Sequence, residues 1–98
     1  MEVIIIGAGK VGYTLAKFLS NEGDNITVID NNIHALNSII EKLDVMGIKG
    51  NGTSLNVLHE AGVSKVDLVI SRVLEFKIAK LLPRSGRGEA TLFFKIIF

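Results

Sequence analysis

Cysteine and tryptophan are absent from this chain of 98 residues, and proline occurs once. Without cysteine, the chain has no means to form a disulfide bond, a thiolate nucleophile or a cysteine-ligated metal site. Its two histidines, His34 and His59, are too few for a histidine-built zinc site without carboxylate help. No apolar run approaches the ~20 residues of a membrane span, and the segment after Met1 lacks the pattern of a secretory signal. We therefore expect a cytoplasmic protein without a metal site.

The composition is that of one folded domain, residues 1–98, with 48% hydrophobic and 21% charged residues. The net charge of +1 gives no sign of a nucleic-acid partner, and none is expected. The charge is unevenly distributed, however. Residues 1–70 contain five lysines and eight acidic residues, whereas residues 71–98 contain six basic and two acidic residues. All three arginines lie in the second segment, so the sequence changes character near residue 72.

Apolar runs alternate with segments of helical spacing along the first 71 residues. Strands are predicted at residues 3–6, 26–29 and 66–71, with a weaker one at residues 44–49. Helices are predicted over residues 10–20, 33–43 and 55–61, with residues 30–32 and Thr53 as candidate N-caps. This order predicts a parallel sheet with right-handed crossovers. Beyond residue 71, we expect a helix over residues 73–82 and a strand over residues 91–98 that docks as a fifth strand beside residues 66–70.

Gly7, Gly9 and Gly12 form a G-x-G-x-x-G motif between the first predicted strand and the first predicted helix. In this setting the first glycine permits a tight turn, and the second lets the backbone approach a pyrophosphate. The third lets the helix lie against the strand. The unpaired N–H groups and positive dipole end of the helix then face the phosphates. The motif therefore predicts a phosphate-binding loop, and glycines that serve packing alone are the alternative.

Asp30 ends the second predicted strand, eighteen residues after Gly12. This is close to the spacing of about 20 for the acid that holds a ribose hydroxyl. A carboxylate there repels a 2′-phosphate, so NAD(H) or another unphosphorylated ribose is favoured over NADP. Lys10, inside the loop, is either a phosphate ligand or a solvated surface lysine. Both histidines are expected to be ordinary surface residues, and no placed acid, base or nucleophile accompanies the loop. We therefore expect binding without catalytic turnover.

Three sequence elements are shared with a known family. They are residues 4–12 running into Leu15 and Ala16, residues 28–30, and residues 50–54 with parts of the segment 58–70. The chain resembles, over residues 1–71, the N-terminal nucleotide-binding domain of Trk-type potassium-uptake regulators, the TrkA or RCK family. The first two elements occur in many Rossmann proteins, whereas the third is more particular to this family. The family usually has an aspartate where this chain has Asn51. After Ser71 the chain departs from the family pattern, so a truncated second half of the fold is expected.

The resemblance implies a Rossmann-like α/β fold of four to five strands with flanking helices, and a regulatory domain that binds NAD(H) or, alternatively, ATP/ADP. It also implies a cytoplasmic place at the inner face of the membrane, beside a potassium-transporting membrane protein; a homo-oligomer stays open. The cofactor-binding residues that the motifs and the resemblance indicate are Gly7, Ala8, Gly9, Lys10, Val11, Gly12, Asp30, Asn31, Asn51, Gly52 and Thr53. Two other functions stay open: the cofactor-binding half of an NAD-dependent oxidoreductase, and a folded remnant without nucleotide affinity.

Overall fold

The computed structural model describes residues 1–71 and 92–95. The strands in these residues are β1 (Glu2–Ile6), β2 (Asn25–Asp30), β3 (Met46–Lys49), β4 (Leu68–Ser71) and β5 (Leu92–Lys95). The helices are α1 (Lys10–Asn21), α2 (Ile33–Lys42), α3 (Leu55–Glu60) and a 3-10 turn, η1 (Val63–Lys65). The strands and helices predicted before residue 72 are confirmed, with bounds that shift by one or two residues. No helix in the described part of the chain is long and apolar enough to span a membrane.

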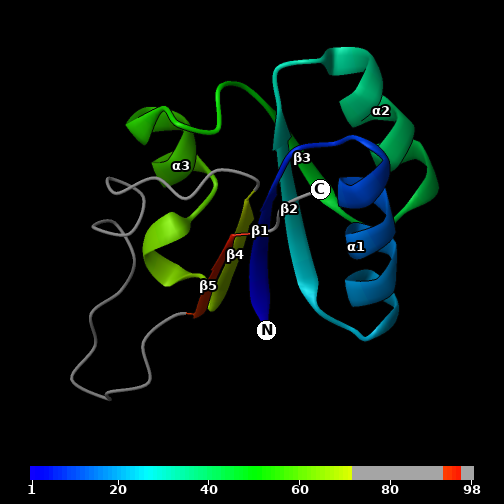
Figure 1. The fold of residues 1–98 in the computed structure, drawn as a ribbon, viewed down its shortest axis with the longest axis horizontal. Coiled ribbons are helices and arrows are strands. Elements are labelled where there is room, and N and C mark those ends of the chain that lie inside the picture. The colour runs from blue at the N-terminus through cyan, green and yellow to red at the C-terminus, as the bar shows by residue number, and fades with distance from the viewer. Residues whose placement is uncertain (72–91, 96–98) are drawn as a thin grey trace.

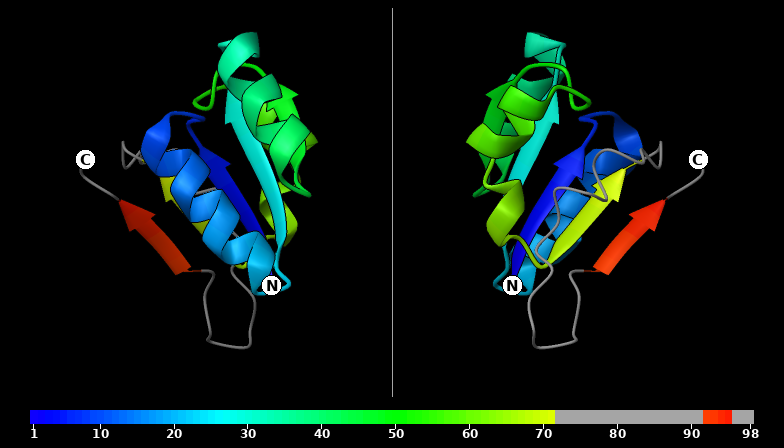
Figure 2. Two further views of the ribbon diagram at one scale, coloured as in Figure 1. Left: turned by 90° about the vertical axis from the view of Figure 1, so that its right-hand side faces the viewer. Right: turned by 90° about the vertical axis from the view of Figure 1, so that its left-hand side faces the viewer.

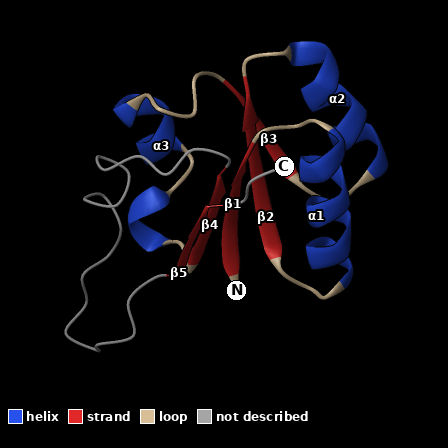
Figure 3. Ribbon diagram, viewed as in Figure 1, coloured by secondary structure: helices blue, strands red, loops and turns tan. Residues whose placement is uncertain are grey.

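The strands form one parallel sheet in the order β3-β2-β1-β4-β5. Helices α1 and α2 cover one face, whereas α3 and η1 cover the other (Figures 1 and 2). Figure 3 shows the same three layers by type of element. The chain runs outward from β1 to β2 and β3 and then returns to the other side of β1 with β4. In sheets of this kind ligands bind at such a reversal, outside the carboxyl ends of the strands.

The central strand β1 is buried on both faces. Val3 and Ile5 pack in the core beneath α1 and α2, whereas Ile4 packs in the core beneath α3. Each of these side chains is at most 1% exposed, and burying an aliphatic side chain of this size stabilises a fold by about 1.5–3 kcal/mol. The unbroken β-branched run therefore anchors both layers of helices and fixes the carboxyl end of β1.

Side-chain caps define where two of the helices begin. The Asn32 side chain accepts hydrogen bonds from two N–H groups in the first turn of α2, which confirms a cap within residues 30–32. The predicted N-cap at Thr53 is wrong, because Ser54 caps α3 instead. The Thr53 hydroxyl and N–H both donate to Oδ1 of Asn51, so this hydroxyl is a donor within the preceding turn and not a helix cap.

The strand predicted at the end of the chain docks at the edge of the sheet. β5 pairs with β4 in parallel, with Leu92 opposite Leu68 and Lys95 opposite Ser71. The expected fifth strand beside residues 66–70 is therefore confirmed for Leu92–Lys95. The helix predicted over residues 73–82, and residues 91 and 96–98 of the predicted strand, lie outside the described residues.

Deleting residues 84–98 is expected to lower the free energy of unfolding by about 2 kcal/mol, because β4 loses its hydrogen bonds to β5, each worth about 0.5–1.5 kcal/mol. For a domain of this size, that corresponds to a fall in melting temperature of roughly 8–16 °C. Thermal unfolding and sedimentation of the full and shortened chains test this. A shortened chain that is equally stable and more monodisperse would show that the tail promotes self-association instead.

Candidate functional site

The glycine-rich motif forms the turn from β1 into α1, at the carboxyl edge of the sheet (Figure 1). Gly7 donates its N–H to the Ile29 carbonyl at 2.8 Å, and its φ of 120° lies in the region that glycine favours. A Cβ added at Gly12 would lie 2.0 Å from the Gly7 carbonyl oxygen, so only glycine lets α1 approach the turn this closely. The backbone itself therefore requires glycine at both positions.

The N-terminus of α1 has no side-chain cap, unlike those of α2 and α3. Its first backbone bond runs from the Tyr13 N–H to the Gly9 carbonyl, at 2.8 Å. Within residues 1–71 and 92–95, the N–H groups of Lys10, Val11 and Gly12 have no hydrogen-bond acceptor. Such unpaired N–H groups, together with the helix dipole, form a positive end that attracts an anion.

Open space lies over Gly9: within residues 1–71 and 92–95, an added Cβ would meet no atom within 4 Å apart from its own chain neighbours. A cavity of about 340 Å³ occupies this region, lined by Ile6, Gly7, Gly9, Lys10, Val11, Gly12 and Asp30. A second cavity of about 520 Å³ lies between α1 and α2 and shares Gly9 and Lys10 with the first. Packing therefore requires glycine at position 12 but not at position 9. At Gly9 the absence of a side chain leaves the backbone accessible to a phosphate.

Asp30, the last residue of β2, lies against this loop. Its Oδ2 accepts a hydrogen bond from the Ala8 N–H at 2.7 Å, and its Oδ1 accepts one from the Asn32 N–H at 2.8 Å. A carboxylate offers about four acceptor positions, so two remain for the hydroxyl groups of a ribose. The capping role belongs to Asn32, because Asp30 precedes the N-cap of α2. Asp30 therefore has the position and the acceptor capacity that ribose binding needs.

The loop of residues 50–53 lies beside the carboxyl ends of β1 and β2. The Gly50 N–H donates to the Asp30 carbonyl at 3.1 Å. A Cβ added at Gly52 would lie 2.3 Å from Cγ2 of Ile6, so this backbone packs directly on the end of β1. Asn51 is exposed in this loop. The structure therefore brings the third sequence element next to Asp30 and to Ile6, the residue before the glycine-rich turn.

Four polar residues singled out by the sequence lie on the surface: Lys10, Asn31, His34 and His59. Their side chains make no hydrogen bond or ion pair within the described residues. Both histidines are therefore confirmed as surface residues. The same part of the chain holds no group of three or more histidines and acidic residues placed to bind a metal.

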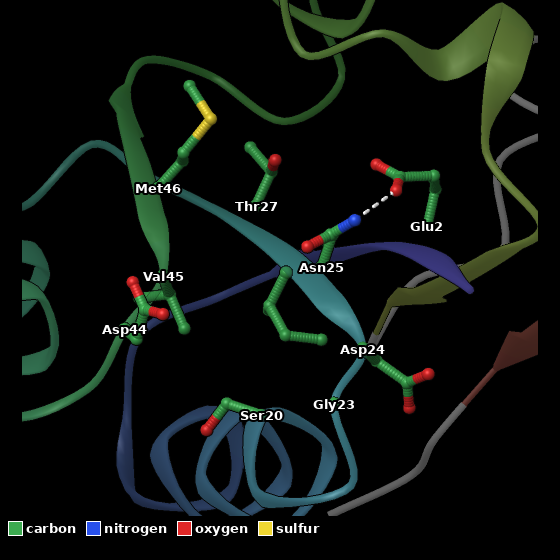
Figure 4. Close-up of a pocket in the computed structure, with 10 residues that line it drawn as sticks. Glu2, Ser20, Gly23, Asp24, Asn25, Thr27, Asp44, Val45 and Met46 are labelled. Atoms are coloured by element: carbon green, nitrogen blue, oxygen red, sulfur yellow. Dashed lines mark hydrogen bonds between the residues drawn. The ribbon is translucent and has the colours of Figure 1, made fainter.

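A third cavity, of about 270 Å³, lies where the first three strands begin, at the end of the sheet opposite the glycine-rich loop. Figure 4 shows the residues that line it. Its lining includes the carboxylates of Glu2, Asp24 and Asp44. Glu2 accepts a hydrogen bond from the Asn25 side chain, and Asp24 accepts one from the Met1 ammonium group at 2.9 Å. The bond to Asp24 raises the pKa of this amino group above its ordinary value. Because carboxylates repel phosphates, this cavity is a poor site for a nucleotide.

Sequence reasoning missed the contacts that hold the site together. The Ile29 carbonyl fixes Gly7, and the Ile6 side chain packs on Gly52. Neither residue carries a polar side chain, so no motif marks it. The only available signal was the glycine at position 52, which is typical of close approach between two segments.

The strand order and the loop are those of a Rossmann-type domain, the class that holds a nucleotide's phosphates at the first strand–helix turn. The sequence also identifies the family within this class. Residues 3–75 match the TrkA-N domain, and the chain belongs to this family.

Curated relatives share a common name. The Trk system potassium uptake protein TrkA of Vibrio alginolyticus is 41% identical over 71 residues, which cover 72% of this chain and 16% of that protein. The Trk system potassium uptake protein TrkA homolog of Methanothermobacter thermautotrophicus is 32% identical over 108 residues, covering 97% of this chain and 50% of that protein. The chain therefore spans half or less of the length of these relatives.

Two solved structures show the same fold. The Shewanella denitrificans Kef CTD in its AMP-bound form matches with a TM-score of 0.60 and 20% identity, covering 83% of this chain and 48% of that one. The Bordetella bronchiseptica enzyme WbmG in complex with NAD matches with a TM-score of 0.63 and 26% identity, covering 79% and 26% of the two chains. The Rossmann-like class predicted from the sequence is therefore confirmed.

Proposed function

We propose that residues 1–98 act as one nucleotide-binding unit that takes NAD(H) or, alternatively, ATP/ADP at the turn from β1 into α1. The 2.7 Å hydrogen bond from the Ala8 N–H to Asp30 is the main support for this proposal, because it holds a carboxylate beside the unpaired N–H groups of α1. The NAD complex of WbmG, which is 26% identical to this chain, supports the same ligand class. The phosphates are assigned to Gly7, Ala8, Gly9, Lys10, Val11 and Gly12, the ribose to Asp30 and Asn31, and the adenine to Asn51, Gly52 and Thr53.

The bound nucleotide is proposed to regulate potassium uptake. Membership of the TrkA-N family and the names of the relatives support this role. The proposed partner is a potassium-transporting membrane protein, which the domain contacts from the cytoplasmic side of the membrane. A change between two nucleotides at the phosphate loop is the proposed signal.

A second candidate function is the cofactor-binding half of an NAD-dependent oxidoreductase, because WbmG is described as an enzyme. The regulatory function is preferred, because the matching family and the names of the curated relatives both refer to potassium uptake. Reproducible substrate-dependent oxidation of NADH by the purified chain, lost on Gly9→Val, would favour the enzyme.

Changing Asp30 to asparagine is expected to weaken NADH binding roughly 10- to 100-fold, because each ribose hydrogen bond to a charged acceptor is worth about 1.5–3 kcal/mol. NADPH binding should weaken less or strengthen, since the 2′-phosphate no longer meets a carboxylate. Calorimetry with NADH, NADPH, ATP and ADP measures both changes, so the NADH-to-NADPH preference is compared within one protein.

Asp44→Asn is the matched control, because it removes the same charge from the cavity at the opposite end of the strands. We expect this variant to bind NADH like the parent chain. If neither variant alters NADH affinity, Asp30 does not hold the ribose. If the parent chain binds none of the four nucleotides, the chain is a folded remnant without nucleotide affinity.

A further inference from the structure

The loop of residues 50–53 contains an asparagine followed directly by a glycine. Asn51 is the only one of the seven asparagines in the chain that precedes glycine. Its side chain is exposed to solvent. Asparagine in this setting is chemically the least protected, because glycine places no side chain in the way of its own backbone nitrogen.

The hydrogen bonds around Asn51 activate its side-chain amide. Oδ1 of Asn51 accepts a bond from the Thr53 N–H at 2.9 Å and another from the Thr53 hydroxyl at 2.8 Å. Two donors on one carbonyl oxygen draw electron density from the carbonyl carbon and stabilise negative charge on that oxygen when a nucleophile adds. The Asn51 amide is therefore held in a polarised state.

The nucleophile for this amide is the backbone nitrogen of the next residue, Gly52. Within the described residues, the Gly52 N–H donates no hydrogen bond, so its nitrogen is not tied into secondary structure. Glycine occupies this position because the Ile6 side chain leaves no space for a Cβ. The same contact therefore requires, directly after the polarised amide, a residue that has no side chain beside its backbone nitrogen.

We propose that Asn51 is a site of spontaneous deamidation in the folded chain. The Gly52 nitrogen, after losing its proton to solvent, bonds to Cγ of Asn51; the Cγ–Nδ2 bond breaks and the amide nitrogen leaves as ammonia. Water then adds to one of the two carbonyl carbons of the resulting cyclic imide. Opening at Cγ gives aspartate, and opening at the main-chain carbonyl gives isoaspartate, so the step needs no reagent besides water.

Both products change the loop beside the candidate nucleotide site. Aspartate adds a negative charge near Asp30, whose carbonyl accepts the Gly50 N–H. Isoaspartate also lengthens the backbone by one atom, where Gly52 packs tightly on Ile6. An effect on nucleotide affinity rests on the proposed function; the chemical conversion does not.

The full chain is incubated at mildly alkaline pH, and the peptide containing Asn51 is followed by mass spectrometry, with isoaspartate resolved by chromatography. Asn37, which precedes Ser38 within α2, is the internal control. We expect Asn51 to convert first, to a mixture of aspartate and isoaspartate. Conversion of Asn51 no faster than Asn37, in a chain whose circular dichroism is unchanged, overturns the proposal.

Thr53→Val tests the activation, because valine keeps the backbone N–H and the shape but removes the hydroxyl. Conversion of Asn51 should slow about two- to tenfold, the rate equivalent of one hydrogen bond of about 0.5–1.5 kcal/mol. An unchanged rate overturns the role assigned to Thr53. Nucleotide binding by the fresh and the converted chain is measured in a separate titration. A chain that binds no nucleotide at either stage contradicts the proposed function. The deamidation proposal is then still judged by the mass spectrometry alone.

Discussion

Gly9→Val is expected to abolish nucleotide binding while leaving the fold intact. The backbone at Gly9 has φ −76° and ψ −165°, an extended conformation that valine adopts readily. Among the described residues, only its own chain neighbours lie within 4 Å of an added Cβ. The valine side chain would therefore extend into the cavity over the loop, where the phosphates are proposed to approach the N–H groups of α1. Losing two such charge-assisted bonds, each about 1.5–3 kcal/mol, weakens binding roughly 100-fold or more.

Calorimetry with NADH and ATP measures the loss of affinity, and thermal unfolding measures the stability of the same sample. Gly9→Ala serves as the graded control, because a single methyl group fills less of the cavity and should cost less affinity. A Gly9→Val chain that binds NADH like the parent would place the nucleotide elsewhere. One that unfolds with the loss of binding would show that the space over Gly9 is needed by the protein itself.

Gly12→Val is expected to lower the stability of the fold itself, whereas Gly9→Val is expected to affect nucleotide binding and leave the fold intact. A Cβ at this position would lie 2.0 Å from the Gly7 carbonyl oxygen, a backbone atom that has no rotamer to change. α1 must move away from the turn, which breaks the fit of Ala16, a fully buried residue on the same helix. Overpacking of this kind costs about 3 kcal/mol or more, which lowers the melting temperature by roughly 12–24 °C.

Thermal unfolding of the Gly9→Val and Gly12→Val variants separates the proposed binding role of Gly9 from the packing role of Gly12. The comparison is direct, because the two variants carry the same substitution three positions apart. We expect the Gly12 variant to melt far below the Gly9 variant. Equal melting temperatures would contradict the packing role of Gly12. A stable Gly12→Val chain would mean that α1 tolerates a shift away from β1.

The strands were predictable because their signal is local. The β-branched run in β1 has to be buried on both faces, and the structure places Val3 and Ile4 in opposite cores. The position of β5 was expected from the length of the connection between the two strands, which suits a β-α-β crossover. The N-cap of α3 was misplaced by one residue, because Thr53 and Ser54 are both capable caps by residue type. Two hydrogen bonds decide between them, one from the Val57 N–H to the Ser54 hydroxyl and one from the Thr53 hydroxyl to Asn51. Local composition reveals neither.

The sequence could name the residues around the glycine-rich loop but not the contacts between them. The glycine motif and Asp30 were evident from spacing alone. The hydrogen bond from Ala8 to Asp30 joins two segments 22 positions apart. The packing of Gly52 on Ile6 likewise joins two segments that are far apart in the sequence, and it forms only when the sheet is assembled. Such contacts are properties of the tertiary structure, and spacing patterns in a single sequence do not encode them.

The bond between Ala8 and Asp30 also bears on how quickly one nucleotide would replace another at the proposed site. It holds the loop in shape without help from a ligand, so arrival of a nucleotide does not first require a disordered segment to find its conformation. Ordering costs of about 0.5–1.5 kcal/mol per immobilised side chain are thereby reduced, and association is not slowed by a folding step. Exchange at a preformed loop is then limited by departure of the bound molecule. Under the proposed function, occupancy of the site therefore follows the ratio of two competing nucleotides as their concentrations change, without any part of the sheet opening.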